Sequence, residues 1–430
     1  MSLFFKIFKP ANPIHWNGRT VSEYSLLAKY KEFFFEYIYR SNFSKESAYR
    51  LLILIKETLI NILIFIYLPI SFLFYFFNYR FLWINTWQLG AYLQQIDSIV
   101  KENILDKNYK LIFLCPKFLL VNNSVHKLYK KKIRTIESFF VYLLFYPCMH
   151  TWFIKKTSWD FETVKKNNKF NFINYRFKKK FNKYQLFNSN FENELEIKKN
   201  IINKIGIKKF DKVIVVQQRD EFFYKSPNTR NSNIQNLNKA LKYLIKKGYK
   251  IIRYKSMNSK SLSLNKKFYK ELTIRDEKDK LEQFIMIKNC RLVICYQGGI
   301  LGYDYICKTP FLLINALPIN INALIKQNDM VLLKKYFSIK LKKFLDISKV
   351  IKMNLHLYND AHTLKRNDIK IIENNSSEII MGVKEILGEQ KFKSVSKTKK
   401  FFPEKFPFTY SDALICNSFI KKNPKIFIKN

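Results

Sequence analysis

The sequence predicts an α/β protein with two half-domains around a cleft, preceded by an apolar helical segment. Three observations support this prediction. Strand-like and helix-like runs alternate over 82–150 and again from 191 to 390, a run of 20 residues at 58–77 carries no charge, and glycine is concentrated at one predicted strand end. Alternation of strands and helices is typical of parallel sheets covered by helices. We divide the chain into five regions: 1–57, polar and helical; 58–81, apolar; 82–190, the first half with a basic linker; 191–390, the second half; and 391–430, a basic tail with a C-terminal helix.

The composition limits the class of protein. The 430 residues carry a formal net charge of +44, which suits nucleic acid or an anionic membrane surface. Lysine is spread through nearly every segment while glycine and proline are scarce, as an AT-rich coding sequence would produce, and we favour that explanation. The 48% hydrophobic content excludes a disordered chain. None of the six cysteines has CxxC or zinc-site spacing, so we expect reduced thiols and no metal site.

The uncharged run 58–77, TLINILIFIYLPISFLFYFF, is long enough to span a bilayer core. It begins too far into the chain for a signal peptide, and Pro69 would kink a helix there. A single span, a re-entrant hairpin in one leaflet and an apolar core helix all remain open. We favour membrane attachment, with the lysine-rich remainder against the anionic cytoplasmic leaflet. The expected location is therefore the cytoplasmic face of the inner membrane.

The stretch 82–150 predicts the first α/β half. Apolar residues recur at helical spacing at Leu89, Leu93, Ile96 and Val100, and KLIFLC at 110–115 is typical of a short buried strand. The following run ESFFVYLLFYP predicts an apolar helix that ends at Pro147.

The stretch 155–190 interleaves Lys and Arg with Phe and Tyr. This pattern suits single-stranded nucleic acid, and it equally suits a linker that touches anionic lipid. It carries no named nucleic-acid motif, so we expect no specific nucleic-acid partner.

From residue 191 the pattern becomes regular. The strand-like runs VIVVQ, KIIRY, RLVIC and PFLLIN alternate with amphipathic runs. The last helix is predicted to begin at Asn375, with Glu378 in a capping-box position, and to end at Gly388. The βαβαβα order predicts a parallel, doubly wound, Rossmann-like sheet.

Two loops at the expected carboxyl edge carry the informative residues, since ligands of open α/β sheets bind beyond the carboxyl ends of the strands. Arg219 and Asp220 directly follow a predicted strand, and Arg230 precedes the next helix. A guanidinium at this place can hold a diphosphate in a bidentate manner. A local salt bridge between Arg219 and Asp220 explains the pair equally well.

The second loop, CYQGGILGYD at 295–304, holds three of the nine glycines of the chain. Gly298 and Gly299 permit positive φ and a close approach of the backbone to a ligand, and N–H groups at a helix start attract phosphate. A tight strand–helix turn, with Gly302 packed between helix and sheet, is the alternative. The pattern is not the GxGxxG fingerprint, and its weight comes from the rarity of glycine in this chain.

Three further residues are candidates. Asp97, on a predicted helix, could act as a catalytic base or be a solvated carboxylate. His126 could act as acid or base, although a surface helix histidine is commoner. Asn315 ends a strand at the cleft edge, where it could contact a ligand or simply precede the turn at Pro318.

In this order, the segments VIVVQQRDEFFY, RNSNIQNLNKALKYLIKKGYKIIR, CRLVICYQGG and TPFLLINALP resemble a poorly characterised bacterial family of GT-B glycosyltransferases. The family resembles the fucosyltransferase-like group, in which an HxR-type loop holds the diphosphate of the sugar nucleotide. The resemblance covers roughly 83–135 and 191–390, and LICNSFIKKNPKIFI resembles the closing helix of the family. It implies a GT-B-like plan of two Rossmann-like halves around a cleft.

The resemblance also implies roles for individual residues. Arg219 would contact the donor diphosphate with Asp220 orienting it, and Arg230 and Asn231 would stand in the Arg-Asn pair of the family. The assignments are a catalytic role for Asp97 and Asp220, donor binding for Arg219, Arg230, Asn231, Gln297, Gly298, Gly299 and Asn315, and the acceptor side for Gly90 and His126. Gln217 and Gln297 stand where relatives often have histidine and serine, and a basic or histidine residue common near Gln88 and Ala91 is missing. These departures affect proton transfer more than donor binding.

The function expected from these observations is that of a membrane-associated glycosyltransferase. It would move a hexosyl-type sugar from a nucleotide-sugar donor to a cell-surface polysaccharide or a lipid-linked glycan. No DxD motif is visible in the cleft loops, so we expect no obligatory metal and no cofactor besides the nucleotide-sugar co-substrate. A catalytically degenerate homologue, or a basic membrane- or nucleic-acid-binding protein, is the alternative.

Overall fold

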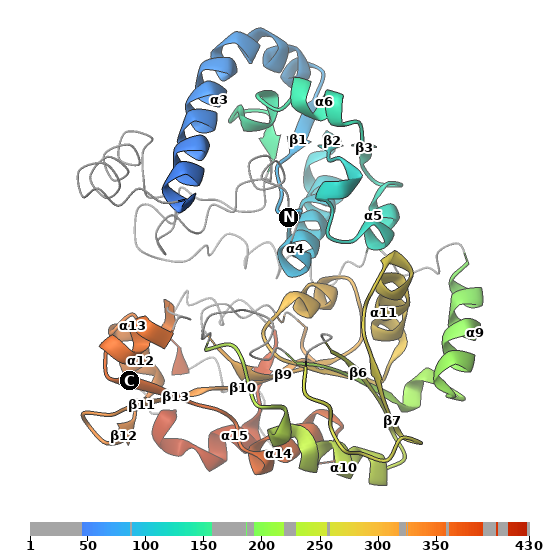
Figure 1. Cartoon of the computed structure of the whole chain (residues 1–430), viewed down its shortest axis with the longest axis vertical. Coiled ribbons are helices and arrows are strands. Elements are labelled where there is room, and N and C mark those ends of the chain that lie inside the picture. The colour runs from blue at the N-terminus through green and yellow to red at the C-terminus, as the bar shows by residue number, and fades with distance from the viewer. Residues whose placement is uncertain are drawn as a thin grey trace. The chain divides into compact units, whose positions relative to one another are not determined.

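The chain forms two compact units, Met1–Asn174 and Tyr175–Asn430, which are described separately here (Figure 1). The structure is a computed structural model that describes residues 45–86, 88–156, 186, 193–218, 229–255, 259–317, 324, 326–357, 361–389, 401–402 and 412–427. All six cysteines lie within these ranges, and all are buried and free, as the sequence predicts.

Unit 1 contains a four-stranded parallel sheet in the order β3-β2-β1-β4. Its strands are β1 (Tyr79–Leu82), β2 (Lys110–Leu114), β3 (Arg134–Ile136) and β4 (Lys155–Lys156). The connecting helices are α4 (Leu89–Glu102), the π-helical turn η3 (Asn103–Lys107), the 3-10 turn η4 (Lys117–Leu119), α5 (Asn123–Tyr129), α6 (Phe139–Leu144) and the 3-10 turn η5 (Cys148–His150). The predicted strand at 110–115 and the predicted helix from Leu89 are confirmed. The apolar helix expected up to Pro147 is shorter and ends at Leu144.

Helix α4 packs its predicted apolar stripe into the core of unit 1. Tyr92, Leu93, Ile96 and Ile99 are fully buried, while polar side chains alternate with them. Several of these polar side chains, among them Gln95 and Asp97, are buried too, so α4 is enclosed on more than its apolar stripe.

Helix α3 (Lys45–Phe76) precedes the sheet and extends further toward the N-terminus than the uncharged run. Its segment Leu54–Phe76 has a mean hydropathy of 2.2, and it is the one helix of the described residues long and apolar enough to cross a membrane. Only 11% of its most apolar window is buried, so it is not a core helix. It is one helix with Pro69 inside it, and Figure 1 shows it changing direction along its length. A proline that removes one N–H from the helical ladder explains such a bend.

Unit 2 is built on a seven-stranded parallel sheet in the order β14-β10-β9-β8-β5-β6-β7. The strands are β5 (Val213–Gln217), β6 (Lys250–Tyr254), β7 (Tyr269–Leu272), β8 (Leu292–Cys295), β9 (Phe311–Ala316), β10 (Met330–Leu333) and β14 (Leu414–Ile415). Its longer helices are α9 (Glu194–Ile205), α10 (Asn238–Lys246), α11 (Glu277–Asn289) and α14 (Ser376–Ile386). Figure 1 shows α10 and α14 on one face of the sheet and α11 on the other. The predicted parallel, doubly wound sheet is therefore confirmed.

A small antiparallel sheet lies beside the large one. Its strands are β12 (Lys343–Phe344), β11 (Lys335–Ser338) and β13 (Ile369–Ile372), accompanied by the short helices α12 (Ile347–Lys352) and α13 (Ala361–Arg366). The sequence analysis did not predict it. Strand β13 leads directly into α14, which begins with the predicted capping box of Asn375 and Glu378.

The C-terminal segment closes unit 2. Strand β14 pairs with β10, and the short helix α15 (Asn417–Lys422) packs on α14. The carboxylate of Glu385, on α14, accepts hydrogen bonds from the backbone N–H groups of Asn417 (2.8 Å) and Ser418 (2.9 Å). These bonds satisfy donors that a helix N-terminus leaves free, so a buried acidic side chain fixes the end of the chain in place.

Candidate functional site

The two loops singled out by sequence meet at one point of the unit 2 sheet. Strands β6 and β7 lie on one side of β5, and β8, β9 and β10 lie on the other, so the strand order reverses between β5 and β8. At the carboxyl ends of these two strands Gln217 lies opposite Cys295, and the backbone N–H of Tyr296 donates to the carbonyl of Gln217 (3.2 Å). Ligands of open α/β sheets bind at such a switch point. Arg219 and Asp220 follow within two or three positions but lie outside the described residues.

Four buried polar atoms along this edge lack a hydrogen bond of normal geometry within the described part of the chain. They are the Tyr296 hydroxyl, Asn315 Nδ2, Arg253 Nε and Ser232 Oγ. Their residues are at most 7% exposed. Burial raises the pKa of Tyr296 well above its ordinary value, and the Asn315 side chain lies close enough to its hydroxyl to oppose that rise as a hydrogen-bond partner, although not at normal geometry. Since buried polar groups in proteins are nearly always paired, this cluster marks a place where a polar ligand can supply the missing partners.

Arg253, near the end of β6, is the most buried cation of this edge, at 1% exposure. Its guanidinium donates to Glu271 Oε1 (2.8 Å), to the carbonyl of Lys260 (2.7 Å) and to Gln218 Oε1 (3.4 Å). Burial alone would raise the pKa of Glu271. Hydrogen bonds from Tyr269, Ser261 and Lys255 and the charge of Arg253 outweigh it and lower the pKa to about 2. Gln218 is also bonded through its amide to the carbonyl of Ser232. The residue that precedes Arg219 is thus held from two sides.

The glycine loop differs from its predicted conformation. Gly298 has φ −168° and ψ −170°, an extended backbone that any residue adopts, so the predicted positive φ is wrong for it. Among the described residues, the atom nearest to a Cβ built there is the carbonyl oxygen of Tyr296, at 3.9 Å. The element that follows is the short 3-10 helix η9 (Gly299–Tyr305) instead of the predicted α-helix. A short 3-10 helix does not supply the α-helical N-terminus that was predicted to bind phosphate. The space next to the Gly298 backbone still allows a ligand to approach it.

The side chains of Gln297 and Asn315 hold neighbouring loops together. Gln297 is 3% exposed, and its Oε1 accepts from the backbone N–H of Leu317 (2.8 Å). Asn315 has φ +54° and exchanges two hydrogen bonds with Asn374, each from a backbone N–H to the partner's side-chain oxygen (2.7 and 2.6 Å). Asparagine tolerates this left-handed conformation better than most residues. Both predicted donor ligands are therefore engaged in the scaffold of the edge, with Asn315 Nδ2 left over.

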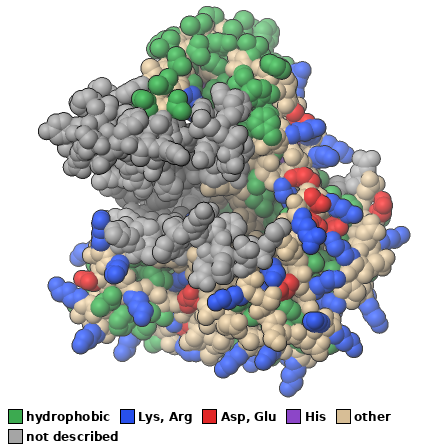
Figure 2. Space-filling model, in the orientation of Figure 1, with side chains coloured by type: hydrophobic (Ala, Val, Ile, Leu, Met, Phe, Trp, Pro, Cys, Tyr) green, Lys and Arg blue, Asp and Glu red, His purple; other side chains and the backbone are tan. Residues whose placement is uncertain are grey.

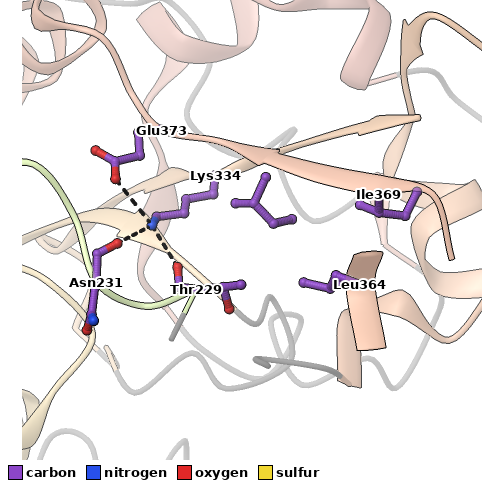
Figure 3. A pocket seen from close by; sticks show the side chains of 7 residues that line it. Thr229, Asn231, Lys334, Leu364, Ile369 and Glu373 are labelled. Atoms are coloured by element: carbon purple, nitrogen blue, oxygen red, sulfur yellow. Dashed lines mark hydrogen bonds and ion pairs between the residues drawn. The ribbon is translucent and has the colours of Figure 1, made fainter. Parts of the chain in front are cut away.

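Asn231 lines a cavity of about 250 Å³ beside the same edge (Figure 3). Lys334, directly after β10, donates to the backbone carbonyls of Thr229 and Asn231, both at 2.7 Å, and lies 3.8 Å from Glu373. Figure 3 shows Leu364 and Ile369 on the far wall. Burial lowers the pKa of Lys334 to about 8, although Glu373 opposes this. Lys334 thus fixes the outgoing end of the loop that contains Arg219, with Arg230 between its two carbonyl partners.

The two titratable candidates in unit 1, Asp97 and His126, are buried and hydrogen-bonded. Asp97 is 1% exposed and pairs with Lys101 (2.6 Å), and the Tyr129 hydroxyl donates to it (3.4 Å). Burial raises its pKa while Lys101 opposes that rise. His126 is 1% exposed, with Nδ1 bonded to the Tyr92 hydroxyl (2.6 Å) and Nε2 to the Thr135 hydroxyl (3.2 Å). The solvated-carboxylate and surface-histidine alternatives are thus both wrong. Gly90 lies in the first turn of α4.

The neutral state of His126 gives a testable pH dependence. Burial, aided by Lys130, lowers its pKa from 6.5 to about 4. Between pH 6.5 and pH 4, His126 is therefore protonated in the unfolded chain but neutral in the folded chain. The free energy of unfolding should fall by on the order of 3 kcal/mol as the pH drops from neutral toward 4. Denaturant unfolding of wild type and His126→Gln measures this effect. The difference between their free energies of unfolding should be smaller at pH 4.5 than at pH 7. An unchanged difference would contradict the assignment.

Sequence reasoning missed Arg253, Tyr296 and Lys334. Each has a recognisable signal, because a charged or hydroxyl-bearing side chain stands inside or directly after an otherwise apolar strand, in KIIRY, LVICY and MVLLK. Such positions lie at the carboxyl edge of a parallel sheet. Among the described residues no group of three His, Cys, Asp or Glu side chains suits a metal ion.

Fold and edge together define the class: an α/β protein with a doubly wound parallel sheet and a polar site at the switch point. No protein-family model and no curated protein matches the chain. Among solved structures, ADP-heptose LPS heptosyltransferase II of E. coli is similar with a TM-score of 0.41 and 11% identity, covering 72% of this chain and 99% of that chain. The iron-containing dodecameric glycosyltransferase TibC of enterotoxigenic E. coli is similar with a TM-score of 0.33 and 11% identity, covering 56% of this chain and 58% of that one. Similarities of this extent do not assign the chain to a family.

Proposed function

We propose that this chain is a glycosyltransferase that transfers a sugar from a nucleotide-sugar donor bound at the switch point of unit 2. The observation that supports the proposal is that β5 and β8 lie side by side, with Gln217 opposite Cys295, and that buried polar atoms near these strand ends lack hydrogen bonds of normal geometry. A nucleotide-sugar offers many hydroxyl and phosphate oxygens and ring nitrogens, which are the complements such a cluster needs.

The chemistry of sugar transfer fits this edge. The bond between the anomeric carbon and the diphosphate oxygen breaks, the acceptor hydroxyl bonds to that carbon, and negative charge accumulates on the diphosphate. In sequence, Arg219 directly follows Gln218, which Arg253 holds, and Arg230 lies between Thr229 and Asn231, whose carbonyls accept from Lys334. Fixed cations aimed at a leaving group stabilise its charge without reorganisation, and a bound geometry supplies orientation.

Proton transfer has fewer candidates. Asp97 is paired with Lys101 inside the core of unit 1, and both ring nitrogens of His126 are bonded. Within the proposal the base that accepts the hydroxyl proton is therefore Asp220, which follows Arg219 in the donor loop. Gly90 and His126 keep the role of shaping unit 1, where the acceptor is expected.

Calorimetric titration with UDP-, GDP-, ADP- and CMP-sugars tests the proposal. Arg219→Ala should weaken the binding of the donor that wild type selects by about 10- to 100-fold, because charge-assisted bonds to phosphate are lost. A matched control is Arg291→Ala, which removes an exposed arginine at the opposite, amino end of β8. Equal affinities for Arg219→Ala and wild type would remove Arg219 from the site. A folded protein that binds none of the four donors would overturn the proposed function.

We also propose that the protein works at a membrane, on the cytoplasmic face, with a polysaccharide or lipid-linked glycan as acceptor. The supporting observation is α3, whose 23-residue segment from Leu54 to Phe76 has a mean hydropathy of 2.2 and is mostly exposed. Exposed apolar surface of this extent is unfavourable in water and favours contact with lipid.

A further inference from the structure

Unit 1 contains a second uncharged stretch besides the one in α3. Residues 138–154, SFFVYLLFYPCMHTWFI, carry no Lys, Arg, Asp or Glu, although such residues make up 26% of the chain. Burial lowers the pKa of His150 to about 3, so its ring is neutral. The stretch includes α6 and η5, which belong to the α/β body rather than to the apolar helix.

The two uncharged stretches pack against each other. The hydroxyls of Ser71 and Thr151 are 3.2 Å apart in a buried contact. The rings of Phe72 and Phe153 stack with centroids 4.7 Å apart, and Phe74 meets Phe145 edge to face at 5.6 Å. The C-terminal half of α3 therefore lies against the body of unit 1.

Both stretches leave large apolar side chains exposed. From the body these are Phe140, Leu144 and Trp152, at 82, 55 and 71% exposure. Helix α3 adds Phe65 (74%) and Phe76 (81%) with several neighbours between them. Figure 2 shows the hydrophobic side chains gathered over α3 and α6 with few charges among them. Apolar surface from two distant parts of the chain thus forms one composite apolar face.

The position of α3 decides how this face meets a bilayer. A spanning helix needs about 20 residues free of the protein body, or roughly 30 Å. Here the part of α3 from Phe72 onward is packed against the body, and the apolar part before Pro69, from Leu54 to Leu68, rises only about 22 Å. A spanning helix would also leave Phe140 and Trp152 in water. Aromatic side chains favour the boundary between headgroups and acyl chains.

Basic residues border the face where α3 ends. Lys107 and Lys110 are exposed, and the ammonium of Lys110 lies 5.2 Å from the ring of Tyr79, which itself contacts Phe74. Cations at the edge of the apolar face would contact the headgroups of anionic phospholipids when the face is inserted in the bilayer. The net charge of +44 agrees with such a contact.

We propose that unit 1 binds the surface of an anionic phospholipid bilayer through the composite apolar face, with α3, α6 and Trp152 inserted side by side into one leaflet. The proposal builds on the membrane attachment proposed above and is independent of sugar transfer. It adds residues of the folded body to the lipid contact and makes α3 an interfacial helix rather than a spanning one.

Co-flotation of the full chain with phosphatidylcholine–phosphatidylglycerol vesicles tests the proposal. The triple variant Phe140→Ser, Leu144→Ser, Trp152→Ser should lower the partition coefficient at least about tenfold, since three large apolar side chains leave the lipid. A matched control replaces three exposed apolar residues of unit 2, as Ile339→Ser, Leu341→Ser and Met353→Ser, and should bind as wild type does. All six positions are at least 49% exposed, so the substitutions leave the core unchanged, and thermal melting checks that both variants fold.

A second measurement reads Trp152 directly. Brominated phospholipids should quench a tryptophan component that is present in wild type and absent in Trp152→Phe. If the triple variant binds like wild type and Trp152 is not quenched, α3 alone carries the attachment and the composite face is disproved. If wild type does not bind vesicles, or self-associates through this face instead, the membrane attachment itself fails. Donor titration is unaffected by either result, so failure of the sugar-transfer proposal remains distinguishable.

Discussion

Replacing Gly298 by valine should abolish donor binding while leaving the fold intact. Gly298 has an extended backbone, and among the described residues the nearest atom to a built Cβ is 3.9 Å away, so the described fold does not require glycine there. If glycine serves a purpose at this position, the purpose is to let a ligand approach the backbone. A valine side chain would fill that space, and donor affinity should fall at least about 100-fold by steric exclusion. Calorimetry with the selected donor and thermal melting measure the two effects separately.

Gly382, on α14, serves as a control in which substitution should lower stability but not donor affinity. A Cβ there would meet Leu332 Cδ1 at 3.1 Å and Cys416 Sγ at 3.4 Å, so Gly382→Ala should lower the melting temperature. The folded fraction should keep the donor affinity of wild type. Tight donor binding by Gly298→Val, or a large loss of stability, would show that the glycine serves the loop and not a ligand.

Replacing Glu271 by leucine should destabilise unit 2 by about 3–5 kcal/mol, because it leaves the buried guanidinium of Arg253 without its counter-charge. Lys255, Ser261 and Tyr269 lose an acceptor at the same time. Urea unfolding measures the loss. Donor affinity should fall as well, since Arg253 also holds Gln218 beside Arg219.

Two further variants make this measurement specific. Glu277→Gln removes a carboxylate from an exposed pair with Lys280 (2.5 Å), and should change stability by no more than about 0.5 kcal/mol. The double variant Arg253→Leu, Glu271→Leu removes both buried charges and should recover part of the loss. If the free energy of unfolding of Glu271→Leu lies within about 1 kcal/mol of the wild-type value, the Arg253–Glu271 pair does not stabilise unit 2 as its burial indicates.

Local patterns were sufficient to predict the elements of the fold. The spacing of Leu93 and Ile96 gave α4, the run KLIFLC gave β2, and the pair Asn375 and Glu378 gave the start of α14. These patterns arise from residues that interact within one helical turn or one strand. Such residues are close in sequence, so the pattern is visible in a short segment. The small sheet of β11, β12 and β13 escaped because its strands are short and the pairing of β11 with β13 spans about 30 residues.

Burial was harder to predict than secondary structure. The spacing of Asp97 and Lys101 shows that they can pair on a helix, but not that both lie in the core. His126 looks like a surface residue until Tyr92 and Thr135, from two other elements, are found beside it. Both environments depend on which helix faces the sheet, and that is decided by the whole unit.

The candidate site was predictable in part for the same reason. That Gln217 and Tyr296 end strands could be deduced, and their strands are neighbours. The partners that hold the site, Arg253 on Gln218 and Lys334 on Asn231, bridge 35 and 103 positions of sequence. The composite apolar face likewise joins stretches about 80 residues apart.

The donor loop is tied at both ends by buried lysine and arginine side chains that belong to the sheet, Arg253 through Gln218 and Lys334 through Thr229 and Asn231. Residues 219–228 connect these two fixed points. Loops between two anchored points tolerate changes of length at a small cost in entropy, so insertions between Gln218 and Thr229 should lower the stability of unit 2 only slightly. If the proposed donor site is correct, exchanging residues 219–228 should change donor choice, and calorimetric titration of such variants measures it.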